Sequence, residues 1–223
     1  MTSGAIRSGL VFTLAAVLLA FTANASAQDV PLEDQPIGRY VVDVRAAFPK
    51  FKQDPNIATG IGVTALNLPT RALGVVFGAH WYPVRFGPMA VGVGGEVIMA
   101  GRKRTLPPTT EDGVAGPTVH SHMSSVTPQI SFNFGKRQGW SYISGGIGGT
   151  AFTAEKVDAP LPAQESRSRT FNYGGGARWF SKKHVALSMD LRFYAINAQL
   201  QTSVRPAVSR MTLVVFSVGA GFK

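Results

Sequence analysis

Apolar and polar side chains alternate along most of the chain with a period of two residues. In the first such segment, Tyr40, Val42 and Val44 share one parity, whereas Asp43 and Arg45 share the other. Successive side chains of a β-strand point to opposite faces, so this alternation predicts strands with one apolar face each. Interrupted by turn residues, the pattern predicts an all-β chain with eight strands, near residues 39–48, 73–82, 89–99, 126–134, 140–153, 171–179, 185–193 and 214–222.

Three features leave details of this assignment open. In the glycine-rich fifth segment Trp140 favours one parity and Ile143 and Ile147 favour the other, so no phase is assigned to it. Residues 57–68 could extend the first hairpin or form another strand pair, which leaves a ten-stranded alternative. Pro128 lies inside the fourth segment and cannot donate a ladder hydrogen bond, so we expect a bulge there or a strand start after it.

The connections between the predicted strands alternate between short and long. Residues 83–88, 135–139 and 181–184 form short connections, and the long ones cover 49–70, 100–124, 154–169 and 197–209. An antiparallel up-and-down β-barrel places all short turns at one end and all long loops at the other, and transmembrane barrels have their short turns on the periplasmic side.

The two faces of the predicted strands differ in charge. The apolar faces of the seven strands with a clear phase carry no Asp, Glu, Lys or Arg. A soluble barrel would need these faces inside, where Phe, Trp and Tyr from almost every strand would crowd a narrow lumen. We therefore predict a transmembrane barrel with apolar faces toward lipid and a small-residue polar lumen. The lumen is predicted to hold a network of paired charges, with Arg178 bound to Asp190, formed by Asp43, Arg45, Glu96, Arg178, Asp190 and Arg192.

Aromatic residues gather near the predicted short turns. Trp81, Trp140 and Trp179 each lie within a few residues of one such turn, and Phe222 lies at the same end of the last strand. Aromatic side chains are enriched where a barrel meets the membrane interface. These four residues are therefore predicted to form part of an aromatic girdle.

A basic triplet, Arg102, Lys103 and Arg104, follows the third strand at its long-loop end. The phosphates of lipopolysaccharide occupy that level of the outer leaflet, and guanidinium groups bind phosphate through charge-assisted hydrogen bonds. We predict that the triplet contacts lipid headgroups, with simple anchoring of the strand at the interface as the alternative.

Composition places this barrel in an exported protein. The chain has 223 residues, 45% of them hydrophobic and 15% charged, with no cysteine, which argues against disorder and excludes a disulfide scaffold. An apolar run at residues 10–21 followed by Ala25, Ser26 and Ala27 predicts a signal peptide over residues 1–27. Residues 28–37 then form a short periplasmic segment, and residues 38–223 form the barrel. The net charge of +10 comes from scattered Lys and Arg, a pattern that does not predict nucleic-acid binding.

Few residues suggest catalysis or cofactor binding. The glycine clusters are not followed by Lys-Ser or Lys-Thr, so no phosphate-binding loop is predicted. His120 and His122 would share a strand face as metal ligands can, but no third ligand is evident nearby in the sequence, so neither a metal nor a cofactor is predicted. His122 and Ser124 are similar in spacing to the His–Ser pair of lipid A deacylase barrels, but the nearest strand acid, Glu96, has inward parity.

Taken together, the signal peptide, the alternating strands and the aromatic at the end of the last strand resemble the small eight-stranded outer-membrane β-barrels of Gram-negative bacteria, related to the membrane domain of outer-membrane protein A. The resemblance implies a monomer in the cell outer membrane and recognition of the C-terminal aromatic by the barrel-assembly machinery. Because no segment follows the last predicted strand, we do not expect the peptidoglycan-binding domain that longer relatives carry. Here Lys223 follows Phe222. It also implies a structural or surface-interaction function through the long loops, without catalysis. A narrow solute pore and a lipid A-modifying enzyme are the alternatives.

Overall fold

Eight strands make up almost all of the regular structure in the computed structural model, which describes residues 38–108, 115–136, 139–160, 167–182, 184–203 and 205–223. The predicted signal peptide and periplasmic segment lie outside these residues. The strands are β1 (Tyr40–Lys50), β2 (Leu73–Phe86), β3 (Met89–Thr105), β4 (Thr118–Lys136), β5 (Gly139–Lys156), β6 (Ser168–Lys182), β7 (Val185–Ile196) and β8 (Met211–Phe222). The first long connection contains helix α2 (Pro55–Gly60) and the 3-10 turn η1 (Ala65–Asn67).

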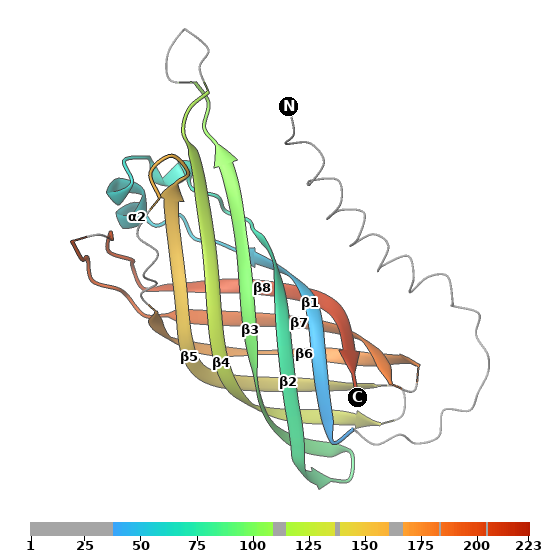
Figure 1. Ribbon diagram of the computed structural model, residues 1–223. Coiled ribbons are helices and arrows are strands. Elements are labelled where there is room, and N and C mark those ends of the chain that lie inside the picture. The colour runs from blue at the N-terminus through green and yellow to red at the C-terminus, as the bar shows by residue number, and fades with distance from the viewer. Residues whose placement is uncertain (1–37, 109–114, 137–138, 161–166, 183, 204) are drawn as a thin grey trace. The chain divides into compact units, whose positions relative to one another are not determined.

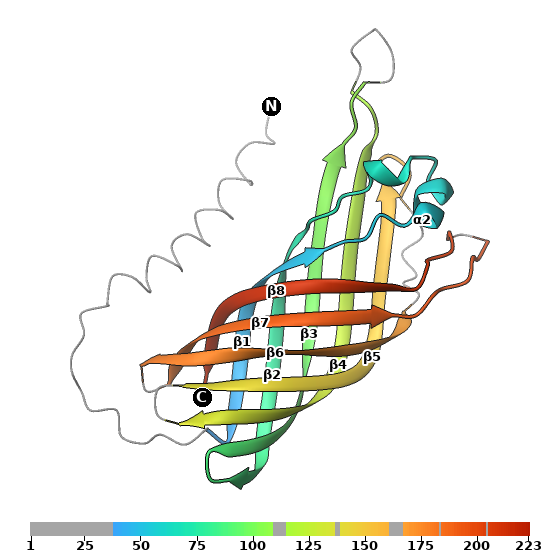
Figure 2. The same ribbon diagram turned by 180° about the vertical axis from the view of Figure 1, so that it is seen from behind.

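The strands form one closed antiparallel up-and-down barrel, as predicted (Figures 1 and 2). Each strand pairs with its neighbour in sequence, and β1 also pairs with β8, from Val42 opposite Phe222 to Lys50 opposite Val214. The closure leaves no edge strand, so the ladder hydrogen bonds are satisfied within the wall. Within the described residues, no helix is long and apolar enough to span a bilayer.

The ten-stranded alternative is wrong because residues 57–68 fold as helical turns. Pro55 occupies the first turn of α2, where its missing N–H needs no partner, and the Asp54 side chain accepts a hydrogen bond from Asn56 N at 2.8 Å. This cap starts a helix where a strand pair would otherwise continue.

The orientation of β5 resolves the phase that its sequence left open. Ile143 and Ile147 face outward, whereas Trp140 and Tyr142 are buried in the lumen. The neighbouring strand makes room for the rings, since a Cβ added at Gly176 would lie 2.7 Å from the Tyr142 hydroxyl. The other seven strands have the predicted phase, with their apolar faces outward.

The expectation of a bulge or a strand start at Pro128 is wrong. β4 continues through Pro128, and its pairing with β3 is unbroken there, with Gly95 opposite the proline. On the β5 side, pairing stops after Val126 and resumes at Gln129 in the same register. The barrel therefore accommodates the proline as a local gap in one ladder without a shift of register.

The two ends of the barrel differ as the connection lengths predicted. The short connections lie at the end where β1 begins and β8 ends, and α2 lies at the opposite end with the long connections (Figure 1). We call these the periplasmic and the extracellular end. β3, β4 and β5 are the longest strands, with 17, 19 and 18 residues.

Candidate functional site: the lumen and the extracellular rim

The six charged residues predicted for the lumen all lie there, fully buried. They comprise three guanidinium groups and three carboxylates, so their formal charges cancel. This balance is what a desolvated lumen requires, because an unpaired ion in a low-dielectric interior is costly. They form two separate groups. The first is the pair of Asp43 and Arg178, and the second contains Arg45, Glu96, Asp190 and Arg192.

The second group is a closed ring of four ion pairs, which we call the charge quartet. Glu96 binds Arg45 and also lies 2.7 Å from Arg192 Nε. Asp190 completes the ring, 2.9 Å from Arg192 Nε and 3.4 Å from Arg45 Nη1. The Tyr142 hydroxyl donates to Asp190 at 2.7 Å and accepts from Arg45 at 3.1 Å. The quartet thus ties β1, β3 and β7 together across the lumen, and Tyr142 joins β5 to them.

The prediction that Arg178 binds Asp190 is wrong. Arg178 Nε donates to Asp43 Oδ1 at 3.1 Å, and the Arg178 guanidinium lies over the Tyr142 ring at 4.2 Å from the centroid. Asp190 lies in the quartet instead. The alternation along the strands correctly placed the Asp43 and Asp190 carboxylates in the lumen. The stagger of the strands, however, brings β1 with Asp43, rather than β7 with Asp190, to the Arg178 side chain.

The extracellular half of the lumen holds a large apolar cluster besides small polar residues such as Ser125, Thr150 and Thr170, so the prediction of a small-residue polar lumen holds only in part. Inward side chains of the strands form a buried cluster with residues of the first long connection. Phe51 packs edge-on against Phe152 with ring centroids 5.0 Å apart, and Ile57 of α2 joins the same cluster. This cluster, which we call the apolar plug, lies above the charge quartet, toward the extracellular end.

The first connection is fixed in place by the fourth. Asp54 accepts hydrogen bonds from Ser209 N at 2.6 Å and from Ser209 Oγ at 3.1 Å. A Cβ added at Gly60 would lie 2.3 Å from the Pro206 Cβ, so the end of α2 packs directly under the last loop. The apolar plug is therefore held from above as well as by the barrel wall.

Of the four residues predicted for the aromatic girdle, three face outward, and the placement predicted for Trp140 is wrong. Trp81, Trp179 and Phe222 face outward with 60%, 49% and 45% of their surface exposed, whereas Trp140 is 4% exposed. Trp140 packs edge-on against Tyr82 in the lumen, with Arg178 5.7 Å from its ring. It belongs to a buried cluster at the periplasmic end of the lumen, with Val41, Tyr82, Ala90 and Tyr142.

Outside, exposed apolar side chains surround the barrel wall, from Val42 and Val44 on β1 to Phe216 on β8. On β4 the outward apolar residues run from Phe134 to Val126, nine positions, about the length of a membrane-spanning strand. Water would not tolerate so large an apolar surface, whereas lipid covers it. The protein is an eight-stranded transmembrane β-barrel.

The basic triplet does not form one patch. Lys103 is exposed on the outward parity of β3, and Arg102 and Arg104 have the opposite parity. Arg104 Nη1 donates to the Leu66 carbonyl at 2.8 Å, so this arginine also holds the first connection. Consecutive side chains of a strand point to opposite faces, so three adjacent basic residues in a strand cannot all face the lipid.

Exposed cations instead surround the extracellular rim. They lie two or four positions beyond the last outward apolar side chain of their strand, and we call them the rim cations: Lys50, Arg71, Lys103, Arg169 and Arg210. Lys50 and Arg71 are paired in a β-bridge. The rim cations thus come from the ends of five strands, which places positive charge around much of the barrel.

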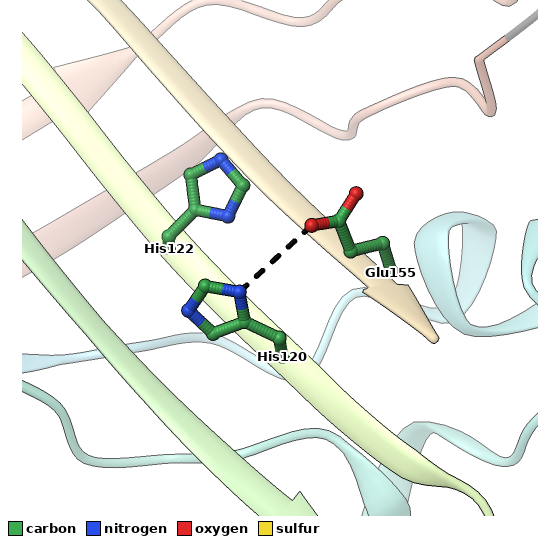
Figure 3. A group of neighbouring side chains, drawn as sticks. All are labelled: His120, His122 and Glu155. Carbon is green, nitrogen blue, oxygen red and sulfur yellow. Dashed lines mark ion pairs between the residues drawn. The ribbon is translucent and has the colours of Figure 1, made fainter. Parts of the chain in front are cut away.

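A second cluster lies on the outer face of β4 and β5, beyond the apolar residues that end at Val126 (Figure 3). His120 and His122 follow each other on β4 with ring centroids 5.1 Å apart. Glu155 lies opposite His120 on β5, with its Oε1 3.8 Å from His120 Nδ1. Partial burial, together with His122 and Lys103, lowers the pKa of His120, and Glu155 opposes this shift.

The expectation that no third ligand lies near the histidines is therefore wrong, and the His122–Ser124 pair does have an outward acid in its neighbourhood. Glu155 is closest across the strands to His120, the histidine further from Ser124. The Ser124 hydroxyl accepts a hydrogen bond from Arg167 at 3.5 Å.

Comparisons with solved structures find other barrels similar to this chain. The barrel resembles Neisserial surface protein A at 14% identity and a TM-score of 0.50, over 83% of this chain and 97% of that one. Ail, the attachment invasion locus protein of Yersinia pestis, matches at 11% identity and a TM-score of 0.45 over 82% and 95% of the two chains. The outer membrane protein OprG from Pseudomonas aeruginosa matches at 12% and 0.45 over 84% and 96%. No protein-family model and no curated protein sequence matches the chain.

Proposed function

We propose that this protein is a closed outer-membrane barrel with a structural or surface-interaction role at the cell surface, without transport through its lumen and without catalysis. The packing of the lumen carries this proposal. Trp140 and Tyr82 occupy its periplasmic end, the charge quartet occupies the middle, and the apolar plug lies in the extracellular half. Ion pairs and packed side chains at all three levels argue against the alternative of a narrow solute pore.

The extracellular rim is then the surface through which the barrel acts. Rim cations lie at the level of the phosphates of the outer leaflet, and several such cations can bind one highly charged lipid. We propose that they contact lipopolysaccharide phosphates, with Lys103 as the only member of the basic triplet that faces this lipid. Phe222, outward at the end of β8, is the residue we expect the barrel-assembly machinery to recognise.

A hydrolase acting on lipid A is the less supported alternative. A Ser–His–acid arrangement requires the acid to orient the histidine that activates the serine. Here that histidine would be His122, whereas the 3.8 Å contact of Glu155 is with His120. The geometry favours a surface role for these side chains.

The rim proposal is tested by two charge-matched double variants. Lys103→Gln/Arg169→Gln removes two outward cations, and Arg102→Gln/Arg104→Gln removes two of inward parity. Binding of the detergent-folded protein to vesicles containing lipid A, with dephosphorylated lipid A as the comparison, is measured at low and high salt. The outward variant should bind phosphorylated lipid A more weakly than the inward variant does. This difference in binding should be large at low salt and small at high salt. Equal binding by the two variants would contradict the proposal.

A further inference from the structure

The cluster on the outer face of β4 and β5 goes beyond a surface role. We propose that His120, His122 and Glu155 form a binding site for a divalent transition-metal ion of the Zn²⁺ type at the extracellular rim. The proposal combines a His-x-His pair on one strand with a carboxylate directly across on the next.

The backbone already brings the three ligands to one side of the wall. His120 and His122 share the outward parity of β4 because they are two residues apart, and the register places Glu155 opposite His120. One ligand atom from each residue lies within 4.8 Å of the other two, with 3.8 Å between His120 Nδ1 and Glu155 Oε1 (Figure 3).

Small side-chain rotations would complete the coordination. Four ligands at about 2.0–2.1 Å from a tetrahedral zinc ion lie roughly 3.3 Å from one another. The observed separations exceed this value by no more than about 1.5 Å, which falls within the reach of histidine and glutamate rotamers. Two imidazoles and one carboxylate form a known set of protein ligands for zinc that leaves the fourth position open.

The surroundings suit a metal that binds nitrogen ligands better than a hard cation. Only one of the three ligands is an oxygen donor, which disfavours Ca²⁺ and Mg²⁺. All three residues are partly buried, so they are restrained while remaining accessible from the extracellular side. Lys103 lies opposite His120 on β3, and its positive charge weakens binding without blocking the open position.

The experiment uses the full barrel, folded in detergent and prepared without a polyhistidine tag. Zn²⁺ binding is measured by competition with a chromophoric chelator, and Co²⁺ is used separately because tetrahedral Co²⁺ gives a characteristic visible absorption. The site variants are His120→Gln, His122→Gln and Glu155→Gln. The matched controls are His184→Gln, an exposed histidine at the periplasmic end, and Asp158→Asn, an exposed acid three positions beyond Glu155. Heat-dependent mobility in gels verifies that each variant is folded.

We expect one equivalent of Zn²⁺ per barrel and at least about a tenfold loss of affinity in each site variant, since even an outer-shell partner of a metal site contributes that much. The controls should bind as the unchanged protein does, and the Co²⁺ spectrum should change in all three site variants. The proposal is overturned if the unchanged protein binds no Zn²⁺. It is also overturned if folded Glu155→Gln keeps full affinity, or if His184→Gln loses as much affinity as the site variants, which would indicate only an adventitious ion.

Discussion

The ion pair between Asp43 and Arg178 allows a quantitative test of how the lumen is stabilised. Both side chains are completely buried, at 0% and 2% of exposed side-chain surface. Asp43→Asn keeps the shape of the side chain and removes the charge, which leaves the Arg178 guanidinium buried without its counter-ion. Removing one partner of a buried ion pair costs about 3–5 kcal/mol.

The surrounding rings set the expected value at the lower end of this range. The guanidinium still lies 4.2 Å from the Tyr142 centroid and 5.7 Å from that of Trp140. A desolvated cation–π contact is worth up to about 2 kcal/mol, so it offsets part of the loss. We expect Asp43→Asn to lower the free energy of unfolding by about 3 kcal/mol. The double variant Asp43→Asn/Arg178→Met, which removes both charges, should lie within about 2 kcal/mol of the unchanged protein.

The measurement is equilibrium unfolding by urea in lipid vesicles, followed by tryptophan fluorescence. Asp158→Asn is the matched control, because it removes the same charge from an exposed loop position and should change stability by less than about 0.5 kcal/mol. The reasoning is refuted if the single variant is as stable as the control, or if the double variant is less stable than the single one.

Three further outcomes are expected from the wall of the barrel. In single-tryptophan variants, brominated lipids should quench Trp81 and Trp179 but leave Trp140 largely unquenched, and equal quenching would place Trp140 in the interface. Ile130→Arg puts a charge on the lipid face, where Ile130 is 54% exposed, and should lower the unfolding free energy by about 2–4 kcal/mol in vesicles; an unchanged midpoint would argue against lipid contact there. Pro128→Val restores an N–H toward β5 and should raise this free energy by about 1 kcal/mol, whereas a loss of stability would show that the gap in the ladder is needed.

The sequence was sufficient to predict the number of strands and the orientation of seven of them. A strand whose outer side chains contact lipid and whose inner side chains are charged shows a strong period-two pattern. On β1, for example, Val42 and Val44 alternate with Asp43 and Arg45. The alternation did not give the orientation of β5, because an aromatic ring can lie either at the membrane interface or in a narrow lumen. The identity of Trp140 alone therefore did not indicate which of the two it faces. It also missed the apolar plug, where Phe152 and Leu213 face inward and apolar residues occupy the inner face as well.

Contacts between strands were harder to predict than faces. Parity placed Asp43 and Asp190 in the lumen but did not give the stagger that decides which one meets Arg178. Glu155 could have been found, because a hairpin turn fixes the register of its two strands. Lys136 pairs with Gly139, and counting outward from this turn by equal steps brings His120 opposite Glu155.

The central claim is that the lumen is closed by the packing of its side chains. It is tested most directly by recording currents across planar bilayers into which the folded protein has been inserted. With Trp140 at one end, the charge quartet in the middle and the apolar plug above, we predict that the unchanged protein produces no stable conductance steps. Reproducible steps of uniform size from the unchanged, correctly folded protein would contradict the account and favour a solute pore.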